Sequence, residues 1–140
     1  MYRRILVPLV ADEESETAVA LAAELADDYG ARIMAVVVVE VPPALPLDAH
    51  MFEEEALAKR PLEDARAIGY SRGVDVRTHI LRARVAGEAI VEEAKRSQAD
   101  IVVLRAPCYG RRWRMFGKTV DYVLKHAPCR VMVDALPPRP

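Results

Sequence analysis

Basic side chains gather between an apolar run and a short helical stretch in the C-terminal third of the chain. Residues 101–104 are typical of a buried strand, and a helix is expected from Thr119 to His126. Guanidinium and ammonium groups close to the N–H groups of a helix N-terminus suit a phosphate or another anion. This segment is therefore the first candidate anion-binding or nucleotide-binding site, and its members are Arg105, Gly110, Arg111, Gly117, Lys118 and Thr119.

The same basic segment has a second interpretation without a ligand. Its cations, which also include Arg112 and Arg114, would lie in a solvated loop and pair with acidic residues of nearby helices. Trp113 and Phe116 would then anchor the loop by packing rather than stack on a base. A P-loop is excluded, because six residues separate Gly110 from the glycine at position 117 where that motif needs four.

Other arrangements that could support catalysis are weak. The histidines have no metal-ligand spacing, and no Ser/His/Asp set or carboxylate pair stands out. Cys129, at a strand start, is interpreted as a small buried hydrophobe. Cys108 lies among arginines, which favour a thiolate, and is a candidate redox-sensing residue. We therefore predict no metal site, no catalytic residue and no enzyme activity, although a slow ATPase stays open as an alternative.

Composition narrows the class of protein further. The chain has 140 residues, of which 52% are hydrophobic and 29% charged, and this fits one globular domain with a sizeable core. Its net charge of −1 argues against a binder of nucleic acid or of membrane surfaces. No apolar run reaches the roughly 18 residues of a spanning helix, so no membrane insertion is expected. With no signal peptide and no disulfide pattern, we predict a cytoplasmic protein.

Strands and helices alternate along the chain. Short apolar runs predict strands at residues 4–9, 32–39, 74–81, 101–104 and 130–133. Helical periodicity predicts helices at residues 14–29, 48–72, 86–97 and 119–126, and Pro61 should kink or split the second of these. The alternation indicates a single α/β domain with a five-stranded, mainly parallel sheet and helices on both faces. The proline-rich residues 135–140 are expected to form a disordered tail.

In such a sheet, ligands bind beyond the carboxyl ends of the strands. Val10 and Val39, at the ends of the first two strands, therefore complete the set of candidate ligand-binding residues.

Several segments of the chain resemble the universal stress protein family. They are Ile5–Pro8, Glu88–Ala94, Ala99–Val103 and, most specifically, the His126–Val133 turn into the last strand, HAPCRVMV. The resemblance implies a Rossmann-like or flavodoxin-type fold over residues 1–134. It also implies a homodimer, often formed through the last strand, which here would be Val131, Met132 and Val133.

The family's ATP-binding motif is incomplete in this chain. Members that bind ATP are expected to carry Gly-x2-Gly-x9-Gly-(Ser/Thr), and the matching positions here are Leu104, Pro107, Gly117 and Lys118. A proline in place of the second glycine also removes one N–H from any phosphate cradle. Val10 replaces the aspartate expected after the first strand. The resemblance therefore implies a member that does not bind ATP in the usual family manner.

Three functional hypotheses follow. The first is a regulatory or stress-response domain that acts by dimerisation and binding and has no expected cofactor; a membrane transporter is a candidate partner by analogy. The second is an ATP- or AMP-binding sensor, or a slow ATPase, that uses the basic segment. The third is a thiol-based stress sensor acting through Cys108.

Overall fold

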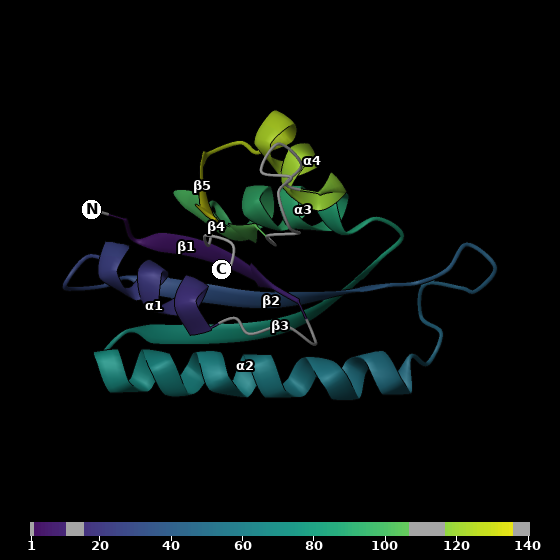
Figure 1. Cartoon of the computed structure of the whole chain (residues 1–140), viewed down its shortest axis with the longest axis horizontal. Helices are drawn as coiled ribbons and strands as arrows, with labels where there is room; N and C mark the ends of the chain where they lie inside the picture. Colours follow the sequence, from purple (N-terminus) through teal and green to yellow (C-terminus); the bar gives the residue numbers. More distant parts are fainter. Residues whose placement is uncertain (1, 11–15, 107–116, 136–140) are drawn as a thin grey trace, which may run out of the picture.

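The computed structural model describes residues 2–10, 16–106 and 117–135 (Figure 1). Five strands form one sheet: β1 (Arg4–Leu9), β2 (Arg32–Glu40), β3 (Asp75–Ala83), β4 (Ile101–Ala106) and β5 (Arg130–Ala135). Their order is β3-β2-β1-β4-β5, and every pairing is parallel. This is the Rossmann strand order, whereas flavodoxin places the second strand at the edge. The Rossmann-like α/β domain expected from the sequence is confirmed.

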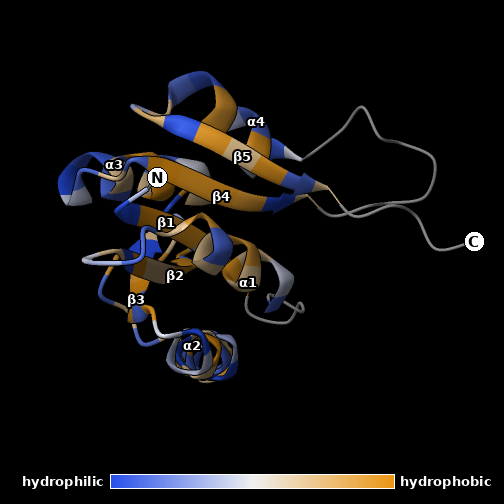
Figure 2. Ribbon diagram, turned by 90° about the vertical axis from the view of Figure 1, so that its left-hand side faces the viewer, coloured by the Kyte–Doolittle hydropathy of each residue, from blue (hydrophilic) through white to orange (hydrophobic). Residues whose placement is uncertain are grey.

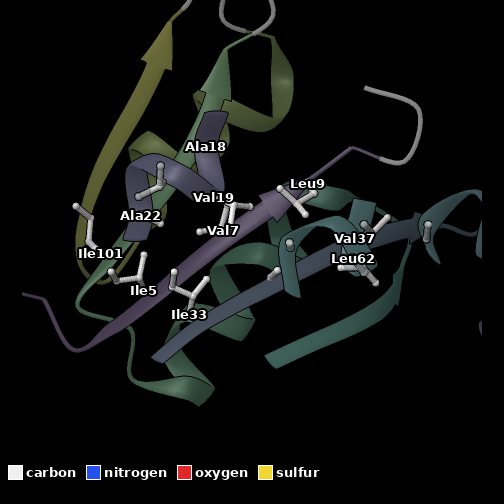
Figure 3. Close-up of a cluster of buried hydrophobic side chains, with 14 residues drawn as sticks. Ile5, Val7, Leu9, Ala18, Val19, Ala22, Ile33, Val37, Leu62 and Ile101 are labelled. Carbon is white, nitrogen blue, oxygen red and sulfur yellow. The ribbon is translucent and has the colours of Figure 1, made fainter. Parts of the chain in front are cut away.

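The inner strands are apolar on both faces because helices cover both. Side chains at odd positions, such as Ile5, Val7 and Ile33, join one buried cluster (Figure 3). Side chains at even positions, such as Leu6 and Val36, join the other. Alternation along the strands thus builds two separate cores.

Two helices pack on each face of the sheet. The first cluster is completed by α1 (Glu16–Leu25) and α2 (Phe52–Arg72), and the second by α3 (Ala86–Ser97) and α4 (Lys118–His126). In Figure 2, α2 lies beside β3 and α4 beside β5, at opposite ends of the sheet. The apolar stripes of four helices therefore cover the sheet.

The expected split of α2 at Pro61 does not occur. Pro61 neither splits nor ends the helix, which runs without interruption for 21 residues (Figure 1). The proline ring is buried beside Leu62 and close to Ala58 and Ala65 on the face that packs against the sheet. Pro61 has no N–H to donate to the carbonyl of Leu57, an exposed residue one turn earlier. The packing of the proline ring offsets this lost hydrogen bond.

Some boundaries also differ from the predicted ones. The first helix ends at Leu25 rather than at residue 29, and α2 begins at Phe52 rather than at residue 48. More important for the site, β4 continues through Arg105 to Ala106, and β5 continues to Ala135. The two strands stay paired over this additional length, since Arg105 and Asp134 are partners in the parallel ladder. The predicted tail beyond position 135 lies outside the described residues.

Candidate functional site

The carboxyl edge of the sheet contains the point at which the strand order reverses. From β1, the chain adds β2 and β3 on one side and then β4 and β5 on the other. The ends of β1 and β4 are therefore neighbours, and a crevice for a ligand is expected beyond them. Gly110, Arg111 and Cys108, three of the predicted site residues, lie outside the described part of the chain.

The other predicted residues of this site differ in their surroundings. Val10 is 54% exposed directly after β1, but Val39 is only 3% exposed and belongs to the core. Arg105 is half-buried near the end of β4. Gly117, Lys118 and Thr119 (the third half-buried) lie at the start of α4. Val10, Arg105 and residues 117–119 thus lie near the carboxyl ends of strands or at the start of α4, whereas the side chain of Val39 packs inside the domain.

Leu104 explains why the ATP-binding motif fails at its first position. Its side chain is 4% exposed and packs in the cluster that includes Val36, Val102 and Ile90. In the ladder it is the partner of Val133. The residue that matches the family's first glycine is therefore a core residue of a strand, and the loop begins at least two residues later.

The N-cap residue of α4 is a glycine and therefore has no side chain that could cap the helix. Gly117 occupies the N-cap position with φ +89° and ψ 163°, a conformation that a side chain would strain, so glycine is needed there. The Gly117 carbonyl accepts the N–H of Asp121 at 3.0 Å. Lys118 is exposed at the first position of the helix. The dipole of a helix N-terminus and an adjacent ammonium group are features that favour an anion.

The N-terminus of α3 is different, because a carboxylate of this chain already lies on it. Glu40, the last residue of β2, accepts the N–H of Ala86 with its Oε2 atom at 3.3 Å. No side chain of the N-cap residue, Val85, contributes. Glu40 was not predicted from the sequence, although an acidic residue that ends an otherwise apolar strand is a usable signal.

Two arginines at the end of β3 hold the loop that follows β2. Arg84 Nη1 donates to the carbonyls of Pro42 at 2.5 Å, Leu45 at 2.6 Å and Val41 at 3.3 Å. Arg82 donates to the carbonyl of Ala49 at 2.5 Å and forms an ion pair with Glu55 of α2. This arrangement was not predicted from the sequence, because most of the partners are backbone atoms that lie far away along the chain.

The described residues offer no other reactive centre. Burial, and then the negative charge of Asp100, raise the pKa of the Cys129 thiol, so this cysteine is not activated. Within the described ranges, no group of three His, Cys, Asp or Glu side chains could hold a metal ion. None of the helices in those ranges is long and apolar enough to cross a membrane.

The two edge strands present different surfaces. On β5, Val131, Met132 and Val133 are half-buried, and β5 pairs with β4 alone. On β3, the exposed residues include Asp75, which forms ion pairs with Arg77 of its own strand at 3.4 Å and with Arg32 of β2 at 3.1 Å. Charged edges resist pairing with another sheet, whereas apolar edges permit it.

Comparisons with known proteins give the same fold over the whole chain. A universal stress protein of Methanocaldococcus jannaschii is 27% identical over 146 residues, 98% of this chain and 84% of that one. A universal stress protein structure from Archaeoglobus fulgidus in complex with dAMP has a TM-score of 0.73, with 24% identity and coverage of 94% and 97% of the two chains.

A plant relative shares the fold at lower identity. The structure of an Arabidopsis thaliana universal stress protein family member with AMP bound has a TM-score of 0.64, with 16% identity and coverage of 96% and 92%. At such identities the structural likeness shows the fold alone. The family itself rests on a sequence match, since residues 1–134 match the model of the universal stress protein family. The chain therefore belongs to the universal stress protein family.

Proposed function

We propose that this protein is a cytoplasmic regulatory domain that acts by homodimerisation and partner binding, without turnover and without binding ATP in the usual family manner. The observation that carries the proposal is Leu104, buried in the core at the position of the motif's first glycine. A strand whose groups are engaged in the ladder and the core does not form a phosphate loop. A membrane transporter is retained as a candidate partner by analogy.

The dimer is proposed to form through β5. Its half-buried row Val131, Met132 and Val133 lies on an edge strand whose outer side has no neighbour among the described strands. Two copies related by a twofold axis would pair these strands and bury the row.

A Met132→Asp substitution tests the dimer. It should place a charge in the interface and leave a monomer in sedimentation experiments at tens of micromolar, where the unmodified chain is expected to be a dimer. His79→Asp, at an exposed position of the other edge strand, is the matched control and should stay dimeric. A monomeric unmodified chain would end this part of the proposal.

A nucleotide-binding function is the second candidate, including a sensor role or slow ATP hydrolysis. Relatives of the same fold have been solved with dAMP and with AMP. In this chain, the start of α4 with Gly117, Lys118 and Thr119 favours a phosphate, and Arg105 would add charge beside it.

Thermal unfolding in the presence of ATP, ADP and AMP separates the two candidates. If the first is right, the melting temperature stays constant as nucleotide concentration rises. A ligand at 100 times its Kd would instead add about 2.7 kcal/mol of stability. If a shift occurs, Lys118→Gln should reduce it, whereas Lys125→Gln at the other end of α4 should not. Such a pattern would replace the first candidate by the second.

The thiol-sensor hypothesis needs a separate measurement. Alkylation rates of Cys108 across pH should show reactivity well below pH 8 if its thiolate is favoured by the neighbouring arginines. Cys129, whose pKa is raised by burial, is the internal reference in the same chain. Reactivity of an ordinary free thiol at Cys108 would end the hypothesis.

A further inference from the structure

The loop after β2 and the first turns of α2 expose large apolar side chains. We call residues 42–57 the tip. Within it, Leu45 is 41% exposed, Leu47 48%, Phe52 70% and Leu57 54%. Figure 1 shows this segment extending beyond the carboxyl edge of the sheet. Single exposed apolar residues are ordinary, but four within thirteen positions call for a physical account.

The backbone of the tip is held in place. Leu45 donates its N–H to the Pro42 carbonyl at 3.0 Å, and Ala49 donates to the Pro46 carbonyl at 3.0 Å, which forms two successive turns. Arg84 and Arg82 fix these turns to β3, as described above. The rings of His50 and Phe52 stack with centroids 5.0 Å apart and planes 2° from parallel. A surface fixed in advance loses little conformational freedom on binding.

The tip is also acidic. Asp48, Glu53 and Glu54 are exposed, and no ion pair is observed for them among the described residues. Glu55 is already paired with Arg82. Lys59 and Arg60 come one to two turns further along α2. The exposed apolar side chains are thus accompanied by unpaired carboxylates, and a complementary partner would combine apolar side chains with positive charge.

The chain itself contains such a segment. Residues 111–116, Arg-Arg-Trp-Arg-Met-Phe, combine three arginines with Trp113, Met115 and Phe116. Arginine and tryptophan are the residue types most enriched at the energetic centres of interfaces. We propose that the tip of one molecule binds residues 111–116 of a second copy of this chain.

This contact uses different residues from those of β5. Because the tip and residues 111–116 are different segments of one chain, the contact can link dimers into larger assemblies. It should weaken with salt, because both segments are charged. Association beyond the dimer, reduced between 50 mM and 500 mM salt, is therefore expected.

Charge reversal on each side tests the contact. Glu53→Arg/Glu54→Arg and Arg112→Glu/Arg114→Glu should each weaken association beyond the dimer about tenfold or more. An equal mixture of the two variants should restore it, because each then meets an opposite charge on the other. Glu63→Arg/Arg66→Glu, on exposed later turns of α2, is the control and should behave as the unmodified chain. Sedimentation velocity measures these four samples, the unmodified chain and a chain that carries both reversals.

A labelled peptide of residues 108–118 supplies an independent measurement. It should bind the full chain in fluorescence anisotropy, and Leu47→Ser/Phe52→Ser should weaken binding about tenfold or more while leaving the circular dichroism spectrum unchanged. Unchanged association after both charge reversals, or equal peptide binding by the variant and the unmodified chain, would overturn the proposal. Restoration only when both reversals are on one chain, and not in the mixture, would overturn the second copy as occupant.

Discussion

The two ends of the sheet are built differently. At the amino end, the Asp100 carboxylate accepts the N–H groups of Arg3 and Arg4, both at 2.9 Å. Arg130 donates to the Tyr2 hydroxyl at 3.1 Å across the same end. These contacts join the start of the chain to β4 and β5, so polar groups at this end are engaged in holding strands together.

At the carboxyl end, exposed groups lie beside residues that hold the loops. Val10 and Lys118 are exposed, and the N-cap residue of α4 is a glycine without a side chain. Glu40 covers the N-terminus of α3, and Arg82 and Arg84 hold the loop that follows β2. The comparison predicts that changes at the amino end alter stability alone, whereas changes of exposed residues such as Lys118 at the carboxyl end alter binding.

Among these substitutions, we expect Leu104→Gly to have the largest effect on stability. Leu104 lies within β4, close to the carboxyl end of the sheet. The substitution would restore the motif's first glycine, but it removes a core side chain and should lower the free energy of unfolding by about 3–5 kcal/mol. Urea unfolding measures the loss, and Leu104→Met is the volume-conserving control, with a cost below about 1.5 kcal/mol. Unchanged stability together with a new ATP-dependent thermal shift would contradict the assignment of Leu104 to the core.

Asp100→Asn tests the amino end. The backbone N–H groups of Arg4 and Arg3 hold the pKa of Asp100 below its ordinary value of 3.8. Replacing this exposed carboxylate should lower the free energy of unfolding at pH 7 by about 1 kcal/mol, after allowance for solvent screening. Asp28→Asn is the exposed control and should have no effect.

The same carboxylate predicts a pH dependence. A depressed folded-state pKa means that the unfolded chain binds the proton more tightly, so Asp100 stabilises the fold above about pH 3.8. This contribution should be lost as the pH falls below 3.8 and through the folded-state pKa. Urea midpoints between pH 5 and pH 2.5 measure it, and the difference between the unmodified chain and Asp100→Asn should shrink across that range. A constant difference would show that the carboxylate charge is not what matters.

Glu40→Gln should have the smallest effect. Removing a charge from the exposed N-terminus of α3 should cost about 0.5 kcal/mol at low salt and less at high salt. Glu92→Gln, on an exposed middle turn of the same helix, is the control. If nucleotide binding were detected and Glu40→Gln changed it while leaving stability intact, α3 would have to be included in the ligand site.

Most of the fold could be predicted from the sequence because the signals are local. Uniformly apolar strands such as β2 indicated that helices cover both faces of the sheet. The bounds predicted for α3 are the observed ones. Pro61 was misjudged because a local rule about proline ignores what packing on the sheet contributes to a helix. The ends of α1 and α2 were likewise placed by periodicity, which is weakest at boundaries.

The candidate site was less predictable. Motif counting identified Leu104 as a departure, but only the pairing with β5 shows that it belongs to the core. Val39 was predicted to end the second strand, but it is the penultimate residue of β2, and its side chain is buried in the core. The arginines at positions 82 and 84 bind backbone carbonyls, and such contacts leave no pattern in side-chain types.

The central position of β1 has a consequence for how the chain folds. It pairs with β2, about 28 residues away, and with β4, where Ile5 is the partner of Ile101. The pairing of β1 with β4 closes a longer segment of chain than its pairing with β2, and this costs more chain entropy. The β1–β2–β3 half should therefore assemble before the second half. We therefore expect β1–β4 pairing to limit the folding rate. Until this pairing forms, one edge of β1 can pair with a strand of another chain.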